Sequence, residues 1–272
     1  MWKNLSREEL DRAYNNSLAV PNSSKLTQRW TDTSFKLRGH LTGELSISYG
    51  EVTRQSYDYF SAGNDSSIVV FIHGGFWQNR SKDDFTFIVP SMLEQGLSVA
   101  LLGYRLAPDA AMNEIVLDIQ NGLNAIESKV RGERKSFPGF CLLGWSAGAH
   151  LAASVMDQSN VYATIGVSGI YDLEPMRHCY VNHLLQLDAE MATRYSPILH
   201  TAHFDKPINL LVGNDELSEI QKQTVDFFKY RESKGQKGVL LQLDGLNHFT
   251  ILDELIRKDS QILKLVKVTA KR

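Results

Sequence analysis

Cysteine is scarce in this chain, which has two in 272 residues. Cys141 lies within an apolar run, and Cys179 lies in a polar stretch beside His178. A zinc site needs several cysteine and histidine ligands at close spacing, and the sequence has no such pattern. So few cysteines are typical of a reducing compartment. We therefore expect a cytoplasmic protein without a metal site.

An excess of charge of one sign and long apolar runs are also missing. The 29 basic and 31 acidic residues give a formal net charge of −2, and no basic block stands out, which argues against a nucleic-acid partner. No apolar run approaches the roughly 20 residues that cross a bilayer, and residues 1–10 lack the apolar core of a signal peptide. We expect neither nucleic-acid nor membrane binding. A homodimer stays open, because the sequence does not determine the oligomeric state.

Short continuous apolar runs recur from residue 68 onward, and stretches with helical periodicity separate them. Such runs are typical of parallel strands that are buried on both faces. Upstream, residues 45–49 and 55–60 alternate apolar and polar side chains, which predicts an antiparallel pair. The sequence thus predicts one α/β domain over residues 1–272, with a mostly parallel, doubly wound sheet and an antiparallel N-terminal end. The predicted buried strands are 68–72, 99–102, 140–143, 164–167, 208–212 and 239–243.

Two segments are expected to lie outside this sheet. Ser6 and Glu9 form a capping-box pattern, which predicts a short helix at the start of residues 1–40, followed by a polar stretch that wraps over the surface. Residues 171–206 have no strand pattern and are long for a simple connection. We expect them to form small helices, a lid-like insertion that roofs the site together with the N-terminal helix.

A serine between two glycines follows the apolar run 140–143. Residues 144–148 read G-W-S-A-G, and this G-x-S-x-G pattern between a strand and a helix predicts a sharp turn that lifts the hydroxyl of Ser146 above the sheet. The pattern alone is weak, because it arises by chance in roughly one chain in ten of this length. The assignment of Ser146 as a nucleophile depends on the residues that accompany it.

A histidine and an acid follow the last two predicted strands. His248 lies just after 239–243, and Asp215 and Glu216 lie just after 208–212. The order serine, acid, histidine is that of α/β-hydrolases. His248 would take the proton of the serine hydroxyl, and a carboxylate would hold the imidazole in the required tautomer. Spacing favours Glu216 as the acid, and Asp215 remains the alternative.

Two glycines after the first buried strand predict the remaining part of the site. Residues 73–77 read H-G-G-F-W. Glycines let the main chain approach a substrate closely, so we assign an oxyanion hole to the N–H groups of Gly75, Phe76 and Ala147. We also expect Trp77 to line the substrate pocket, with burial in the core as an equally weighted alternative.

These motifs resemble those of the kynurenine formamidase (arylformamidase) branch of the α/β-hydrolases and of esterases close to it. The resemblance rests on H-G-G-F-W and on G-W-S-A-G-A-H-L, and it extends over about residues 45–255. It implies hydrolysis of N-formyl-kynurenine to kynurenine and formate, in tryptophan breakdown, without a metal or organic cofactor. Further matching segments are 48–51, 167–173, 195–197, 247–249 and Gln223.

Other functions stay open from the sequence alone. Residues 104–108, Y-R-L-A-P, are closer to hormone-sensitive-lipase-like esterases, so a small-molecule carboxylesterase is the main alternative. A non-catalytic binding module is a remote one, because such proteins usually lack a member of the triad and all three residue types are present here. A nucleotide-dependent oxidoreductase would need a G-x-G-x-x-G turn, which this chain lacks. The predicted partner is a small ester or aryl-formamide.

Overall fold

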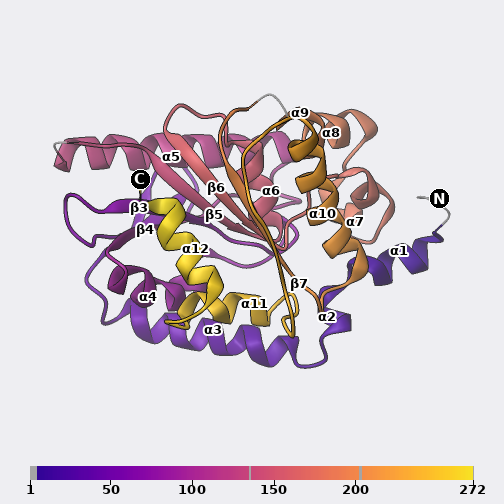
Figure 1. The fold of residues 1–272 in the computed structure, drawn as a ribbon, viewed down its shortest axis with the longest axis horizontal. Helices are drawn as coiled ribbons and strands as arrows, with labels where there is room; N and C mark the ends of the chain where they lie inside the picture. The colour runs from indigo at the N-terminus through magenta and orange to yellow at the C-terminus, as the bar shows by residue number, and fades with distance from the viewer. Residues whose placement is uncertain (1–4, 135, 202–203, 272) are drawn as a thin grey trace.

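The computed structural model describes residues 5–134, 136–201 and 204–271 (Figure 1). Residues 1–4 of the predicted N-terminal segment, residues 202–203 of the predicted insertion and Arg272 lie outside the described residues. The described strands form an eight-stranded sheet in the order β1-β2-β4-β3-β5-β6-β7-β8. They are β1 (Glu44–Ser48), β2 (Ser56–Phe60), β3 (Ser67–Ile72), β4 (Leu97–Leu102), β5 (Phe140–Trp145), β6 (Val161–Val167), β7 (Ile208–Gly213) and β8 (Leu240–Leu243).

The direction of the strands matches the prediction. Strand β2 pairs antiparallel with both β1 and β4, whereas the pairs from β4 through β3, β5, β6 and β7 to β8 are parallel. Because the parallel strands run in one direction, their carboxyl ends meet along one edge of the sheet, where ligands bind in folds of this kind. The predicted doubly wound sheet with an antiparallel N-terminal end is confirmed.

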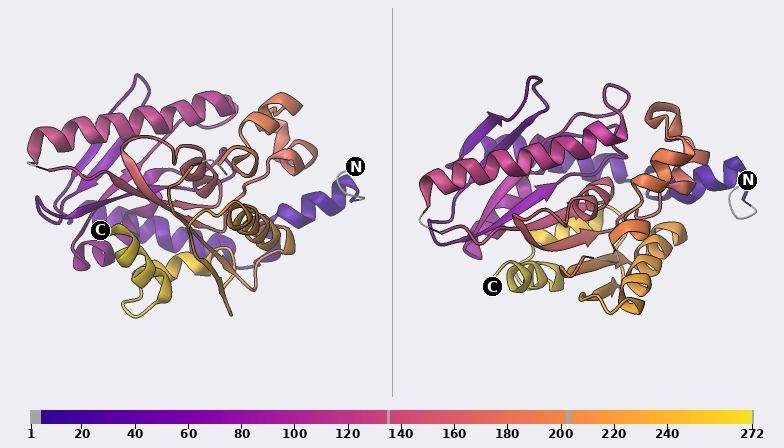
Figure 2. Two further views of the ribbon diagram at one scale, coloured as in Figure 1. Left: turned by 45° about the horizontal axis from the view of Figure 1, so that its top comes forward. Right: turned by 90° about the horizontal axis from the view of Figure 1, so that it is seen from above.

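Helices cover both faces of the sheet (Figures 1 and 2). Side chains alternate between the faces along each strand, so Val70 and Ile72 of β3 join one hydrophobic cluster and Val69 and Phe71 join the other. The first face carries α5 (Met112–Glu133), α6 (Ala147–Ser154) and α10 (Ser218–Ser233). The second carries α3 (Ser23–Arg38), η1 (Lys82–Ile88), α4 (Val89–Glu94), α11 (Thr250–Asp253), η4 (Glu254–Ile256) and α12 (Gln261–Ala270).

The N-terminal segment is more helical than predicted. The capping box of Ser6 and Glu9 begins α1 (Arg7–Tyr14), as expected. Helices α2 (Asn16–Ala19) and α3 follow, where only a polar wrapping stretch was expected. The buried stripe of α3 consists mostly of small polar residues, so its helical period is invisible in apolar residues alone. That stripe is Ser23, Thr27, Trp30 and Ser34.

The segment after β6 forms short helices, as predicted. They are η2 (Glu174–His178), α7 (Asn182–Leu185), α8 (Ala189–Arg194) and α9 (Pro197–His200). Its apolar side chains, among them Leu173, Met176 and Val181, pack into the same cluster as α5. Among the helices of the described residues, none has the length and apolar character needed to span a bilayer.

The contact between α6 and β3 predicts that a methyl group at Gly148 is not tolerated. A Cβ there would lie 2.0 Å from the Ile72 carbonyl oxygen, a main-chain atom of the central sheet that cannot rotate away. We expect Gly148→Ala to lower the free energy of unfolding by about 2 kcal/mol or more. Gly132→Ala is the control, since Gly132 lies in α5 with no atom within 4 Å of the added carbon. That change should stabilise the protein by about 0.5–1 kcal/mol. Urea unfolding measures both, and equal effects would contradict the prediction.

Candidate active site

Ser146 lies in the sharp turn between β5 and α6. Its backbone has φ +56° and ψ −121°, a conformation that a non-glycine residue adopts only under strain. The turn is held by a hydrogen bond from the Ser146 N–H to the Val167 carbonyl oxygen, at 2.8 Å. Close packing leaves no room for a side chain at Gly144 or Gly148, where a Cβ would lie within 2.2 Å of a carbonyl oxygen. The strand, the turn and the helix are therefore fixed relative to one another.

A continuous line of hydrogen bonds joins Ser146, His248 and Glu216. The distance from His248 Nε2 to Ser146 Oγ is 3.0 Å, and that from His248 Nδ1 to Glu216 Oε2 is 2.6 Å. A carboxylate only accepts, so Nδ1 carries the proton and Nε2 is left to accept from the serine hydroxyl. All three residues are buried. The structure thus brings together the serine, histidine and acid that the sequence singles out.

The carboxylate of Glu216 is held from three sides. Its Oε1 accepts hydrogen bonds from the Gly213 N–H at 2.8 Å and from Ser168 Oγ at 2.6 Å, while Oε2 faces His248. The alternative acid, Asp215, is exposed to solvent, and its N–H donates to the Leu246 carbonyl oxygen. Glu216, and not Asp215, is the acid that contacts the histidine.

Ser168 is a site residue that the sequence did not identify. It follows β6 with φ +53°, and this left-handed conformation turns its hydroxyl toward Glu216. A non-glycine residue with positive φ directly after a buried strand cannot be recognised from residue type. The only available signal was its place in the segment 167–173, which matched the family without a role.

The segment after β3 has an unusual backbone. Gly75, Phe76 and Trp77 have φ of +119°, +52° and +59°, so consecutive residues are left-handed. This arrangement leaves the N–H groups of Gly75 and Phe76 without hydrogen-bond partners in the described part of the chain, and the same holds for Ala147 at the start of α6. The N–H groups that the sequence assigns to an oxyanion hole are therefore free to donate, unlike that of Ser146.

His73 fixes the start of this segment through its contacts with Gly74 and Tyr104. A carbonyl only accepts, so the 2.8 Å contact between His73 Nδ1 and the Gly74 oxygen places a proton on Nδ1. The ring stacks on Tyr104 with centroids 4.3 Å apart, and the Tyr104 hydroxyl donates to the His73 carbonyl oxygen at 2.7 Å. Burial lowers the pKa of His73 to about 4, so the ring is neutral at pH 7.

Of the two positions that the sequence left open for Trp77, the structure shows burial in the core. Its side chain is fully buried in the core, and it is not among the residues that line the cavity at Ser146. The left-handed backbone at Trp77 turns the indole inward, where Nε1 donates to His150 Nδ1 at 3.2 Å. His150 Nε2 in turn donates to the Tyr195 carbonyl oxygen at 2.7 Å. Trp77 thus ties the segment 73–77 to α6.

A cavity of about 450 Å³ opens at Ser146. The N-terminal segment contributes Asn16 and Ser17 of α2 to its lining, and these residues follow the helix that was expected to roof the site. The expected contribution of residues 171–206 is absent, because none of the described residues in that range lines this cavity. They contact the lining only indirectly: the ring of Tyr180 packs edge-on against the ring of Phe76, with the centroids 6.1 Å apart. The other lining residues are Gly75, Phe76, Asn79, Arg80, Asp84, Trp145, His248 and Phe249.

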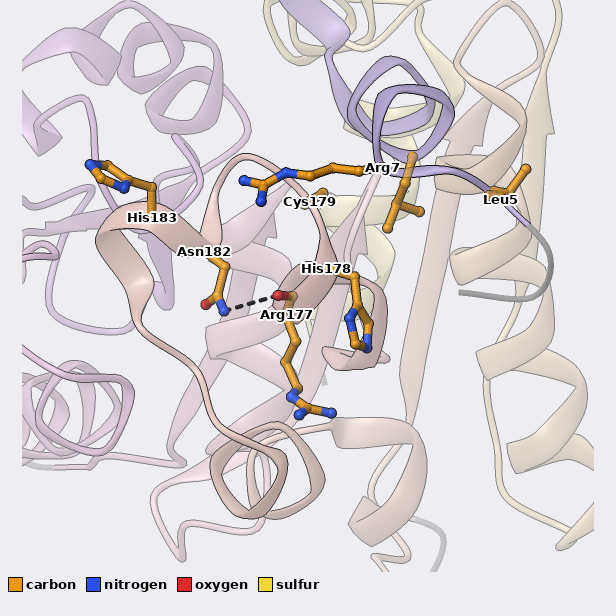
Figure 3. A pocket seen from close by; sticks show the side chains of 8 residues that line it. Leu5, Arg7, Arg177, His178, Cys179, Asn182 and His183 are labelled. Atoms are coloured by element: carbon orange, nitrogen blue, oxygen red, sulfur yellow. Dashed lines mark hydrogen bonds between the residues drawn. The ribbon is translucent and has the colours of Figure 1, made fainter. Parts of the chain in front are cut away.

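A second cavity, of about 520 Å³, lies between the start of α1 and the segment 177–183. It is rich in basic side chains, but they do not converge. Figure 3 shows the guanidinium groups of Arg7 and Arg177 well apart, and Arg177 is already paired with Glu174 at 2.6 Å. None of the residues that surround Ser146 contributes to this cavity, so it offers no second set of groups for the same chemistry.

The described residues contain no cluster of histidine, cysteine and acidic side chains that could hold a metal ion. Both cysteines are buried free thiols, and burial raises the pKa of Cys141 to about 12 and that of Cys179 to about 11. Thiols with raised pKa values are poor nucleophiles at neutral pH. Neither thiol lines the cavity at Ser146.

Comparison with known proteins gives the family. The family model BD-FAE matches residues 58–229, which is more than half of the chain, so the protein belongs to this family. Kynurenine formamidase from Danio rerio is 28% identical over 97% of both chains. The isoprenylcysteine alpha-carbonyl methylesterase ICME from Arabidopsis thaliana is 26% identical over 75% of this chain and 56% of its own.

The fold is also that of a known structure. A crystal structure from Silicibacter sp. tm1040 superposes with a TM-score of 0.85, at 24% identity, and covers 97% of this chain and 99% of its own. The resemblance to the kynurenine formamidase branch of the α/β-hydrolases is confirmed, as is the α/β-hydrolase fold. The chain is an enzyme of the serine hydrolase type.

Burial of His150 predicts a pH-dependent stability. Burial lowers its pKa to about 4, against about 6.5 when unfolded, so the unfolded state binds more protons between these values. The free energy of unfolding should fall as the pH drops through this window. His150→Gln removes this contribution. Between pH 7 and pH 5, the free energy of unfolding of the variant should therefore fall by about 1–2 kcal/mol less than that of the wild type.

Urea unfolding at the two pH values measures this difference. His40→Gln is the control, since it makes the same change at an exposed histidine. If the loss in His150→Gln equals that in the wild type and in His40→Gln, the buried imidazole does not carry the effect.

Proposed function

We propose that this chain is an arylformamidase that hydrolyses N-formyl-kynurenine to kynurenine and formate. The observation that carries the proposal is the buried line from Glu216 through His248 to Ser146, which ends in a cavity beside unpartnered main-chain N–H groups. The name and near-complete coverage of the Danio rerio relative support the choice of substrate. The same proposal assigns catalytic roles to these three residues and an oxyanion hole to Gly75, Phe76 and Ala147.

The first half of the reaction forms a formyl-enzyme. Ser146 Oγ attacks the formyl carbon while His248 Nε2 takes the hydroxyl proton, and the positive imidazolium is stabilised by Glu216. The carbonyl oxygen becomes an oxyanion, which accepts hydrogen bonds from the free N–H groups. Each such donor is typically worth about 3 kcal/mol of barrier. When the C–N bond breaks, His248 returns the proton to the nitrogen, and kynurenine leaves as an arylamine.

The second half releases formate. A water molecule attacks the formyl carbon of the ester while His248 takes a proton from it, and the same N–H groups stabilise the second oxyanion. The C–O bond to Ser146 then breaks, and the proton on His248 goes to the serine oxygen. The formyl group is the smallest acyl group, so it fits between the serine and the donors, and the remainder of the cavity is available to the leaving group.

A carboxylesterase with a different physiological substrate is the second candidate. The same residues would cleave an ester by the same steps, and the Arabidopsis thaliana relative is named as a methylesterase. Esters need less assistance to their leaving group than amides do, so the triad alone does not distinguish the two reactions.

The role of the acid can be tested with a matched pair of variants. Glu216→Gln keeps the shape of the side chain but removes the charge that stabilises the imidazolium, so we expect kcat to fall at least 100-fold. Asp215→Asn makes the same change at the exposed neighbour and should leave kcat within about twofold. Steady-state kinetics with N-formyl-kynurenine measure both, and a larger loss in Asp215→Asn would reverse the assignment.

The choice of substrate can be tested by comparing two kinds of scissile bond. We expect kcat/KM for N-formyl-kynurenine to exceed that for 4-nitrophenyl acetate, because only the former brings both a small acyl group and a leaving group that fills the cavity. Ser146→Ala should abolish both activities and labelling by a fluorophosphonate probe. Efficient cleavage of the ester without any turnover of the formamide would reject the formamidase and leave the esterase.

A further inference from the structure

Asn16 presents an unsatisfied amide to the cavity at Ser146. The residue is 3% exposed, it lines this cavity, and its Nδ2 has no hydrogen-bond partner within the described residues. A buried amide nitrogen without a partner is costly, and native proteins rarely keep one without a reason. The most direct reason is an acceptor that arrives with the substrate. None of the steps proposed for the triad uses Asn16.

Hydrogen bonds on both sides of Asn16 in the chain fix its position. Tyr14, two residues earlier, is fully buried, and its hydroxyl accepts a hydrogen bond from Gln223 Nε2 at 3.1 Å. On the preceding turn of α1, Asp11 accepts from the Tyr180 N–H at 2.6 Å. On the following side, Ser23 Oγ donates to the Ser17 carbonyl oxygen at 3.1 Å. These contacts hold α1 against the body of the enzyme and join α2 to the start of α3, so Asn16 is not a residue of a loose terminal arm.

A cation and an anion lie on the same cavity. Arg80 is half-buried, and its guanidinium has no ion pair in the part of the chain that the structure describes. Asp84 is also half-buried, and its carboxylate accepts from the Ser81 N–H at 3.0 Å and from Thr31 Oγ1 at 2.8 Å. These bonds fix the carboxylate of Asp84 but do not neutralise its charge. The cavity therefore offers an unpaired cation, an unpaired anion and the buried, unpaired amide of Asn16.

We propose that this side of the cavity binds the α-amino-acid end of the leaving group, with Asn16 and Arg80 on its carboxylate and Asp84 on its ammonium group. The inference rests on the proposed function, since it concerns the group that leaves when the formyl group is transferred. A formyl group needs little space, so most of the cavity of about 450 Å³ belongs to the leaving group. A purely anionic group would be repelled by Asp84, whereas a zwitterion satisfies both charges and the amide.

The experiment compares N-formyl-kynurenine with formanilide, an aryl-formamide without the amino-acid end. The variants are Arg80→Gln, Asn16→Ala and Asn16→Asp, of which the last keeps the shape but places a negative charge beside the carboxylate. We expect each to lower kcat/KM for N-formyl-kynurenine about 10- to 100-fold, mainly through KM, which is the range of a charge-assisted hydrogen bond. Activity on formanilide should stay within about twofold.

Asn22→Ala is the matched control, since Asn22 is exposed and its side chain caps no helix. Its kinetics should be those of the wild type on both substrates. Thermal midpoints of all variants separate misfolding from loss of binding. The inference is overturned if Arg80→Gln and Asn16→Asp leave N-formyl-kynurenine turnover unchanged, or lower turnover of both substrates equally.

Failure of the proposed function has a different signature. If the wild type cleaves neither formamide, the formamidase proposal fails, and the variants are compared on 4-nitrophenyl acetate and its ring-carboxylated analogue 5-acetoxy-2-nitrobenzoate. A wild-type preference for the carboxylated ester that Arg80→Gln removes would support a carboxylate site in an esterase. No preference would overturn the carboxylate site as well.

Discussion

The structure is organised around the buried carboxylate of Glu216, whose oxygens both need hydrogen-bond partners from the protein. The Glu216 side chain is withdrawn from solvent, and removing a charge from water is unfavourable unless hydrogen bonds replace the lost hydration. Its partners come from β7 through the Gly213 N–H, from the end of β6 through Ser168, and from the loop after β8 through His248. The ends of these strands must therefore meet in one arrangement, and that arrangement carries the imidazole to Ser146.

Backbone strain is concentrated around this arrangement. The described residues include seven non-glycine residues with positive φ, and five of them are Phe76, Trp77, Arg80, Ser146 and Ser168. Strained residues persist only where the surroundings over-determine them. Here main-chain packing does so, through the approach of Gly148 to Ile72 and through the line from Trp77 over His150 to the Tyr195 carbonyl. The free N–H groups beside Ser146 are thus a consequence of conformations that the fold enforces.

The sequence predicted the parts of the molecule that show a periodic pattern of apolar residues or a motif at recognisable spacing. The buried strands appear as apolar runs, and Ser146, His248 and Glu216 follow such runs in a recognisable order. Outside the G-x-S-x-G turn, residues whose position depends on a left-handed backbone were missed or left open. Trp77 points into the core because of its left-handed backbone, Ser168 reaches Glu216 for the same reason, and α3 buries a mostly polar stripe. Without such a motif, residue type and spacing do not reveal a left-handed residue, and a mostly polar buried stripe leaves no apolar period.

The groups that we propose to cleave the bond and those that we propose to bind the leaving group have different origins in the chain. Ser146, Glu216, His248 and the free N–H groups of Gly75 and Phe76 all follow strands of the sheet, where parallel pairing fixes their relative positions. The other polar groups of the cavity, Asn16, Arg80 and Asp84, come from α2 and from the segment 79–84, which lie outside the strands. On the proposed mechanism, substitutions in these segments would change the leaving group and leave the line from Glu216 through His248 to Ser146 intact. The relatives of this chain are named for a formamide and for an ester, as expected where function depends on the site that a fold supports and not on the fold itself.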